Sequence, residues 1–500
     1  MRWCATGHEG ALEALIARLG ATAWPQAPEG FEHVTPPRPM RVVLRGPLEG
    51  SRGHARVIVK WSRPDTLADH VSRHVRGGKG VREGQVLRAL KAAGVRVPEV
   101  LAYADEGEDV VVTHFVDGLM PLPPADEAPA GLLEDVAVLL ALAHAAGLRH
   151  ADLHAGNLAL SGELPLLVDL GSARMGKPIS DGERARVLAA LAHGLLDGAR
   201  RTQCLRALIA YMRQVHGGDG RTEARALARD VESELRLVRR RFRRGRDRRA
   251  TRTGKHFELI ATGSGLTGIR NRDTTDASWL DRAASWLETQ AEDAQPLKAD
   301  GRIQRLGPLV LKYYDGVAPG RLPRPVRAFR MAYALRNRGI PAPVPHLAVT
   351  DEHGAGVLAS AYIDASNLHD LIATGRYAAL PAAERRSLLE HIGRTLRLMH
   401  DAEVTHRDLK APNLLVTEAG DIVLVDLDGA RVRRGAVRWA RRARDLMRLD
   451  ASLDLPERDR TRILTAYHRV LPAPPEPLDA FATHVAELSR RKRGPSGEAR

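Results

Sequence analysis

Residues His406–Asn413 read HRDLKAPN, and residues His150–Asn157 read HADLHAGN. Both keep the pattern His-x-Asp-x-x-x-x-Asn. Each is followed by an apolar run that leads into an aspartate, in LVDLDGAR at 424–431 and in LVDLGSAR at 167–174. A pattern that recurs along one chain defines domains more firmly than composition does, so we expect two related halves.

Two further blocks repeat upstream in the same order. The apolar run VIVK ends at Lys60 and the run LVLK ends at Lys312, while GVRVP at 94–98 returns as GIPAP at 339–343. One short repeat arises easily by chance. Four collinear repeats indicate a duplication or a shared fold.

The length of the chain agrees with this division. A single hydrophobic core stops growing near ~250 to 300 residues, and the chain has 500. We expect a first domain at 1–240 and a second at 241–485. The Arg-rich segment 241–255 is expected to be a linker, and the basic tail 486–500 is expected to be disordered.

Both halves predict the same order of elements. The runs that end in Lys60 and Lys312 are short and β-branched, which favours strands, and apolar side chains at helical spacing follow them. Amphipathic helices are expected just before His150 and His406. The sequence therefore predicts an α+β fold of two tandem bilobal domains, each with a small mixed-sheet lobe and a helical lobe.

The repeated residues suit phosphoryl transfer. Moving a γ-phosphoryl group requires oxygen ligands for a metal, a carboxylate that orients the acceptor hydroxyl and a cation on the phosphates. The His-x-Asp-x-x-x-x-Asn loop supplies a carboxylate and an amide, the later aspartate a second carboxylate, and the strand lysine the cation. Mg²⁺ prefers such hard oxygen ligands and commonly takes only one or two protein carboxylates.

This combination resembles the protein-kinase-like superfamily over most of both halves. The resemblance implies that ATP binds between the lobes with Mg²⁺, that Asp152 and Asp408 are the catalytic bases, and that Glu83 pairs with the strand lysine of its half. It implies four metal-binding residues, which are Asn157, Asp169, Asn413 and Asp426. It implies that the nucleotide phosphates are contacted by the strand lysines Lys60 and Lys312. Lys410 stands where such kinases place a phosphate-contacting catalytic lysine.

Some features depart from a protein kinase. Ala328 stands at the position of Glu83, so Lys312 is expected to lack its usual partner. No Ala-Pro-Glu follows either later aspartate, so a long peptide-docking segment is not expected. The glycines before the strand lysines do not form a full GxGxxG; they are Gly46, Gly50, Gly53, Gly301 and Gly307. The tandem GIPxP, HRDLKxxN and VDLDGAR pattern is similar to lipopolysaccharide kinases of the Kdo and heptose (WaaP) type. That resemblance implies a sugar of the lipopolysaccharide core as the acceptor, at the cytoplasmic face of the inner membrane.

The charge of the chain favours an anionic partner. The net charge is +15, and eleven of the twenty residues at 236–255 are Lys or Arg. No zinc-finger, RNP-type or helix-turn-helix pattern accompanies the charge, so an acidic lipid or a phosphorylated glycolipid is preferred to nucleic acid. The chain has two cysteines, Cys4 and Cys204, and no apolar stretch long enough for a bilayer, which favours a reducing cytoplasm.

Two alternatives to a sugar or glycolipid kinase remain. A serine/threonine protein kinase is favoured by Lys410 in the second half and disfavoured by His154 at the equivalent position of the first. A pseudokinase half that regulates the other is favoured by Ala328 and disfavoured by the complete second-half set of Asp408, Asn413 and Asp426. The identity of the acceptor, the activity of each half and the oligomeric state stay open.

Overall fold

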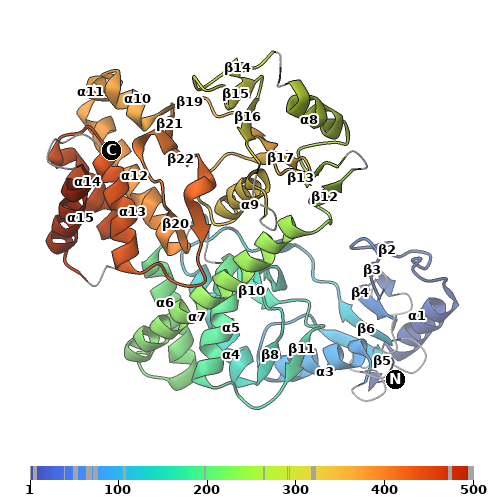
Figure 1. Ribbon diagram of the computed structural model, residues 1–500. Coiled ribbons are helices and arrows are strands. Elements are labelled where there is room, and N and C mark those ends of the chain that lie inside the picture. Colours follow the sequence, from blue (N-terminus) through green and yellow to red (C-terminus); the bar gives the residue numbers. More distant parts are fainter. Residues whose placement is uncertain are drawn as a thin grey trace. The chain divides into compact units, whose positions relative to one another are not determined.

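The computed structural model describes residues 2–3, 8–38, 40–48, 55–63, 70, 77–104, 109–195, 199–262, 265–289, 291, 293–316, 322–470 and 476–493. It divides into two compact units, Met1–Arg240 (unit 1) and Arg241–Arg500 (unit 2). Each unit combines one large sheet with a helical part (Figure 1). Within the described residues, no helix is both long and apolar enough to span a bilayer.

The sheet of unit 1 has six strands in the order β1-β5-β6-β4-β3-β2. The strands are β1 (Arg2–Trp3), β2 (Glu32–His33), β3 (Arg41–Leu48), β4 (Ala55–Ser62), β5 (Val100–Ala104) and β6 (Asp109–His114). Because successive side chains of a strand point to opposite faces, Val110 and Val112 pack in one core and Val111 in another. Helix α1 (Glu9–Ala21) supplies leucines to the first core and α3 (Lys79–Ala92) supplies apolar side chains to the second.

The helical part of unit 1 follows the sheet along the chain. Its helices are α4 (Leu132–Ala145), α5 (Asp181–Leu195), α6 (Arg201–His216) and α7 (Arg221–Asp247). Its short strands are β7 (Leu119–Pro121), β8 (Leu148–His150), β9 (Leu158–Ser161), β10 (Leu164–Leu167) and β11 (Ala173–Met175), and η1 (Ala155–Asn157) is a 3₁₀ turn. A buried contact ties α4 to α6, with His144 Nδ1 2.8 Å from Tyr211 Oη.

The sheet of unit 2 has seven strands in the order β12-β13-β17-β18-β16-β15-β14. They are β12 (Phe257–Ala261), β13 (Thr267–Asn271), β14 (Gln295–Pro296), β15 (Ile303–Leu306), β16 (Leu309–Tyr314), β17 (Pro345–Thr350) and β18 (Gly356–Ala361), preceded by the 3₁₀ turn η2 (Arg248–Thr251). Helix α9 (Arg324–Arg336) packs against one face and α8 (Ser278–Thr289) against the other. The order β17-β18-β16-β15 corresponds to β5-β6-β4-β3 of unit 1.

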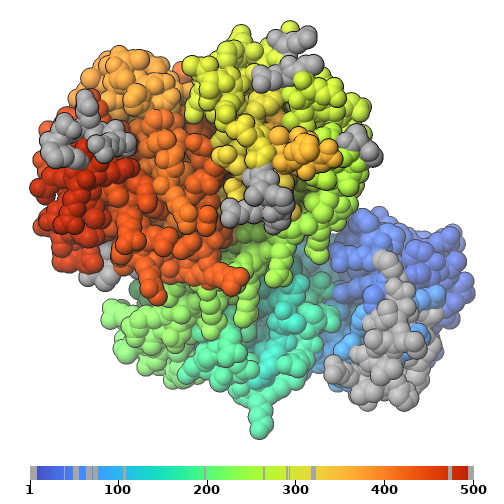
Figure 2. All heavy atoms as spheres, in the orientation of Figure 1, coloured from blue at the N-terminus to red at the C-terminus, as the bar shows by residue number. Residues whose placement is uncertain are grey.

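The helical part of unit 2 is larger, and in the space-filling view its orange and red atoms form one continuous body (Figure 2). Its helices are α10 (Leu368–Ala373), α11 (Arg376–Ala379), α12 (Ala382–Asp401), α13 (Trp439–Ser452), α14 (Glu457–Arg469) and α15 (Leu478–Arg493). Its strands are β19 (Ala365–Asn367), β20 (Val404–His406), β21 (Leu414–Thr417), β22 (Ile422–Leu424) and β23 (Ala430–Val432), with 3₁₀ turns η3 (Ala411–Asn413) and η4 (Leu427–Gly429). The contact between α4 and α6 has a counterpart here, since His400 Nδ1 lies 2.8 Å from Tyr467 Oη.

An α+β architecture is observed, but three details differ from the expectations. All described strand pairings of the two large sheets are antiparallel, because β6 lies between β4 and β5, and β18 between β16 and β17, so the sheets are not mixed. Residues 241–251 of the expected linker continue α7 and then form η2. Residues 486–493 of the expected disordered tail are the end of α15, which is held by buried Phe481 and Val485; the rest of the tail lies outside the described residues.

Candidate active site

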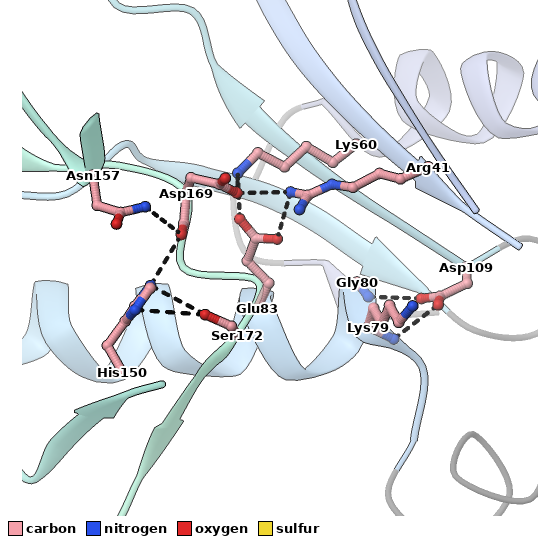
Figure 3. Close-up of polar contacts among 10 residues, drawn as sticks. All are labelled: Arg41, Lys60, Lys79, Gly80, Glu83, Asp109, His150, Asn157, Asp169 and Ser172. Carbon is pink, nitrogen blue, oxygen red and sulfur yellow. Dashed lines mark hydrogen bonds and ion pairs between the residues drawn. The ribbon is translucent and has the colours of Figure 1, made fainter. Parts of the chain in front are cut away.

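The strand lysine of unit 1 lies at the centre of a compact charge cluster. Lys60, on β4, contacts Glu83 Oε1 of α3 and lies 3.2 Å from Asp169 Oδ1 (Figure 3). The Glu83 side chain is only 4% exposed, so its carboxylate is held away from bulk water. Three residues that the sequence separates widely are therefore brought together as expected.

Helix α3 is positioned by its first turn. Asp109 of β6 accepts hydrogen bonds from the backbone amides of Lys79 (2.8 Å) and Gly80 (2.7 Å), which satisfies two of the free donors at the helix start (Figure 3). A side chain at Gly80 would collide with the backbone of Val110, and one at Gly84 would collide with Tyr103. Both glycines thus allow the close approach to the sheet that places Glu83 beside Lys60.

Arg41 is a member of this cluster that sequence reasoning missed. Its Nη2 lies 3.2 Å from Glu83 Oε2 and 3.0 Å from Asp169 Oδ1. Burial raises the pKa of Asp169, but the positive charges of Lys60 and Arg41 outweigh it and leave the pKa below its usual range. Nothing in the local sequence around Arg41 marks it, because its partners lie on a different helix and loop.

The predicted catalytic loop of unit 1, residues 150–157, is organised by His150. Its Nδ1 accepts the backbone amide of Asp152 (3.2 Å), and its Nε2 lies 3.2 Å from the carbonyl oxygen of Asp169 (Figure 3). Asn157 Nδ2 donates to the same carbonyl at 3.5 Å, and Asn157 Oδ1 accepts the amide of His154 at 3.0 Å. Asp152 itself is exposed.

Lys312 of unit 2 has no acid on α9, as expected, but the loop after β22 supplies it with carboxylate partners. On β16, its Nζ lies 2.6 Å from Asp426 Oδ1 and 2.9 Å from Asp428 Oδ2. Ala328, at the position of Glu83, is buried against the sheet and offers no charge. The second acid comes from the loop after the strand rather than from the helix.

The geometry of unit 1 explains why a loop acid can replace a helix acid. Gly171 stands in DLGS where Asp428 stands in DLDG. A Cβ at Gly171 would lie 3.0 Å from Glu83 Oε2, so a side chain at this loop position points to the place of the Glu83 carboxylate. Two features of the sequence indicate this replacement of a helix acid by a loop acid. They are the second acid of the DLD triplet, Asp428, and the absence of any acid on α9.

The charges of unit 2 are strongly coupled. Burial lowers the pKa of Lys312, but Tyr314, Asp426 and Asp428 together raise it above its ordinary value. Burial raises the pKa of Asp426, but Lys312 outweighs it, so this carboxyl is ionised well below neutral pH. Asp169 and Asp426 also share a left-handed backbone, each with φ of 53°, a conformation that side chains rarely adopt and that is concentrated at functional sites.

The catalytic loop of unit 2 also brings its predicted residues together. Asn413 is buried, and its Nδ2 donates to the Asp408 carbonyl at 2.7 Å and lies 3.4 Å from Asp408 Oδ2. Lys410 Nζ lies 2.9 Å from the same carboxylate oxygen. The valine before Asp426 donates its amide to the Asn413 carbonyl at 3.0 Å, which ties this loop to the segment that carries Asp426.

Asp445 of α13 is a second functional residue that sequence reasoning missed. It is buried, and its Oδ2 accepts the backbone amide of His406 at 2.9 Å, which anchors the start of the catalytic loop. Its other oxygen pairs with Arg448 at 2.9 Å. An acid on the buried stripe of an amphipathic helix, between Arg442 and Leu446, is the signal that could have identified it.

Three of the glycines that precede the strand lysines lie in described residues. Gly46 lies within β3, where a side chain would collide with Phe31, so its role is packing. Gly307 is in the tight turn between β15 and β16, and Gly301 lies before β15. Gly50 and Gly53 lie outside the described residues.

The donor atoms present fit a magnesium nucleotide. Each unit offers one carboxylate, from Asp169 or Asp426, near one amide, from Asn157 or Asn413, and a lysine that can contact phosphate. In the described ranges no group of three or more His, Cys, Asp or Glu side chains is placed to hold a metal. A divalent ion at either site would therefore take further ligands from phosphate oxygens, as Mg²⁺ commonly does.

Comparison with known proteins supports the motif-based resemblance. A 3-deoxy-D-manno-octulosonic acid kinase of Xylella fastidiosa (strain M23) is 31% identical over 156 residues, which are 30% of this chain and 61% of the relative. A kinase of the same name from Xanthomonas campestris pv. campestris (strain B100) is 33% identical over 134 residues, 27% of this chain and 51% of the relative. The chain thus spans between half and two thirds of the length of these curated relatives.

Other similarities are to protein kinases. The cyclin-dependent kinase F-1 of Oryza sativa subsp. japonica is 34% identical over 128 residues, 25% of this chain and 26% of the relative. A solved kinase domain, M. tuberculosis PknI, is 20% identical with a TM-score of 0.27 and covers 41% of this chain and 96% of its own. Residues 317–467 match the family described as "Lipopolysaccharide kinase (Kdo/WaaP) family", which confirms the resemblance to that family for this part of the chain.

Proposed function

We propose that the chain transfers the γ-phosphoryl group of ATP to a hydroxyl of a lipopolysaccharide-core or related sugar. One observation carries the proposal: the family match at 317–467 covers the segment in which Asp408, Asn413 and Asp426 meet near Lys312. The relatives' name, 3-deoxy-D-manno-octulosonic acid kinase, supports a sugar acid as the acceptor class.

The roles of the site residues follow from their chemistry. Asp408 and Asp152 would accept the proton of the acceptor hydroxyl, and Lys410 would contact the transferred phosphate. Lys312 and Lys60 would contact the nucleotide phosphates, with Lys60 oriented by Glu83. Mg²⁺, held by the paired Asn and Asp of each unit, would neutralise charge on the phosphates. Each unit thus contains the base, the metal ligands and the strand lysine of this proposal, and unit 2 also contains Lys410.

Both units are proposed to be protein-kinase-like domains in tandem. Support comes from the shared strand order, from a lysine on the corresponding strand of each sheet, and from the repeated buried contacts His144–Tyr211 and His400–Tyr467. The first domain is proposed to end near Arg240, within α7, and the second to extend through α15.

A peripheral contact with the anionic inner face of a membrane is also proposed. A groove of about 620 Å³ between α12 and α14 is lined by five arginines, which are Arg386, Arg394, Arg458, Arg462 and Arg469. Basic residues near anionic headgroups contribute about 1 kcal/mol each. Sedimentation with phosphatidylserine vesicles, but not with phosphatidylcholine vesicles, is the expected result; equal sedimentation with both would contradict it. A cytoplasmic location is part of this proposal.

The test of the activity uses radiolabelled ATP with Mg²⁺ and two acceptors, delipidated core sugar and a generic basic protein. Label in the sugar is expected. Label only in the protein would contradict the sugar acceptor and favour a serine/threonine protein kinase. No Mg²⁺-dependent ATP binding by the full chain would overturn the enzymatic proposal itself.

A further inference from the structure

A cavity of about 720 Å³ lies beside the catalytic loop of unit 1. Its walls come from α3, from the catalytic loop, from the segment after Asp169 and from the start of α5. Ala151 and Gly171 line it, and these residues lie next to Asp152 and two residues after Asp169. Any group bound in the cavity is therefore close to the loops that carry the proposed chemistry.

The walls of the cavity are strongly basic. Four arginines and one glutamate line it, namely Arg82, Arg149, Arg174, Arg186 and Glu183. Arg149 is fully engaged, since it contacts both Glu183 oxygens (3.3 and 3.2 Å) and donates to the Lys177 carbonyl at 2.6 Å. Arg186 is mostly exposed and has only a 4.0 Å contact to Glu234.

Two of the arginines are not neutralised. Within the described part of unit 1, no carboxylate lies within ion-pair distance of the side chain of Arg82 or Arg174. Arg82 Nε is buried and has no hydrogen-bond partner. A buried donor without a partner costs about 1–3 kcal/mol of stability. Such a group in a native structure calls for an explanation, and an ion that completes its hydrogen bonds is one.

We propose that this cavity binds an anionic group, a phosphate or a carboxylate, carried by the acceptor of unit 1. Guanidinium groups bind both kinds of anion through paired N–H donors, and Arg82 and Arg174 have donors to offer. The anchored anion holds the neighbouring hydroxyl of the acceptor near Asp152, which removes rotational freedom before the reaction. The proposal rests on the proposed function, because it names the acceptor class of that site.

Unit 2 shares part of this arginine set. Arg327 precedes Ala328 as Arg82 precedes Glu83, and Arg431 of LVDLDGAR stands where unit 1 has Arg174. Thr405 stands where unit 1 has Arg149, and it is buried with its hydroxyl 3.5 Å from the Arg431 carbonyl. The two units therefore differ here at Arg149, which holds Glu183 in unit 1.

The test is hydrogen exchange of the full chain, followed by mass spectrometry, with three probes: glucose 6-phosphate, gluconate and neutral glucose. A saturable slowing of exchange at residues 147–153 and 171–187 is expected with the two anionic sugars and not with glucose. The relative strength of the two anionic probes shows whether phosphate or carboxylate is preferred. Arg82→Gln and Arg174→Gln are each expected to lower the affinity for the anionic probes by about 10-fold to 100-fold, because each removes a charged hydrogen bond.

Arg88→Gln is the matched control, because it removes the same charge from the same helix without lining the cavity. Equal protection by glucose and glucose 6-phosphate, or unchanged affinity in both Arg82→Gln and Arg174→Gln, would overturn the proposal. ATP binding is measured separately on the same samples. If the wild-type chain does not bind ATP but is still protected from exchange by the anionic sugars, the proposed function is refuted and only an anion-binding site remains.

Discussion

The two units give the same strand lysine a carboxylate from different elements. In unit 1 the partner of Lys60 is Glu83 on helix α3, and in unit 2 the second partner of Lys312 is Asp428 on the loop after β22. Both arrangements leave the aspartate at φ 53° within reach of the lysine. The lysine thus requires an acid at one place in space, and two different positions in sequence can supply it.

The two units also differ in how the start of the predicted catalytic loop is held. Unit 2 anchors its loop with the buried Asp445, which accepts the amide of His406. In the described part of unit 1, no side-chain carboxylate accepts the amide of His150, and the cavity lined by Arg82 and Arg174 lies there instead. Unit 2 thus fixes the start of this loop with a buried carboxylate, whereas in unit 1 a basic cavity lies beside it. Because Asp428 supplies an acid to Lys312, the absence of a helix acid is poor evidence that unit 2 is inactive.

The largest expected effect comes from the aspartates proposed as catalytic bases. Asp408→Ala and Asp152→Ala are each expected to lower kcat of the unit concerned by about 10² to 10⁴-fold, because each removes the proposed general base of its unit. The measurement is phosphoryl transfer from labelled ATP by the full chain, for each variant and for the double variant. If Asp408→Ala leaves all transfer intact, unit 1 alone is the enzyme; if both single variants keep full activity, neither aspartate is a base.

The exchange of helix acid for loop acid can be tested directly. Asp428→Asn is expected to lower kcat/KM for ATP in unit 2 by about 10-fold to 100-fold, because a charged hydrogen bond to Lys312 is lost. Glu83→Gln is expected to have a similar effect in unit 1. Asp421→Asn, an exposed change in the same unit, is the control.

A stricter test moves the acid of unit 2 from position 428 on the loop to position 328 on α9. In the double variant Ala328→Glu, Asp428→Gly, unit 2 receives the arrangement of unit 1, and part of the lost activity is expected to return. Lower activity than in Asp428→Gly alone would show that the buried site at Ala328 cannot accept a carboxylate.

The buried histidines His144 and His400 are expected to affect the stability of their units at acidic pH. Burial, helped by Arg184, lowers the pKa of His144 from 6.5 to about 4. Burial also lowers the pKa of His400, but there Asp445 acts in the opposite direction. At a pH between the ordinary and the lowered pKa of His144, this histidine is protonated in the unfolded chain and neutral in the folded unit. The free energy of unfolding therefore falls as the pH drops through this range. From pH 7 to pH 5 the expected loss in unit 1 is about 2 kcal/mol.

Hydrogen exchange in α4 and α6 at the two pH values measures this loss. His144→Gln removes the titrating group, so its protection should depend less on pH than that of the wild type. An identical pH dependence in the variant would exclude His144 as the cause.

The smallest effect is expected at Arg41. Its side chain is 28% exposed and bridges Glu83 and Asp169, and partly exposed ion pairs contribute about 0 to 1 kcal/mol. Arg41→Gln is therefore expected to change kcat/KM for ATP by less than about fivefold. A loss as large as that of Glu83→Gln would show that Arg41 contacts the nucleotide itself.

The sequence by itself determined the α+β class, the two repeated sets of chemistry-bearing residues and the resemblance to lipopolysaccharide kinases. Strand lysines, the His-x-Asp-x-x-x-x-Asn loops and the later aspartates could be found because each is a local pattern with its own spacing. The structure brings Lys60, Glu83 and Asp169 together, and Lys312 with Asp426, as that pattern predicts.

Only the tertiary structure decided which acid serves Lys312, the presence of Arg41 and Asp445 around the sites, and the arginine cavity of unit 1. These contacts join residues that lie far apart in the chain, and no local periodicity reports them. They depend on how closely a helix approaches a sheet, which glycines such as Gly80 and Gly84 control. The reactive groups can be recognised from local sequence patterns, whereas their charged partners are determined by the packing of distant segments.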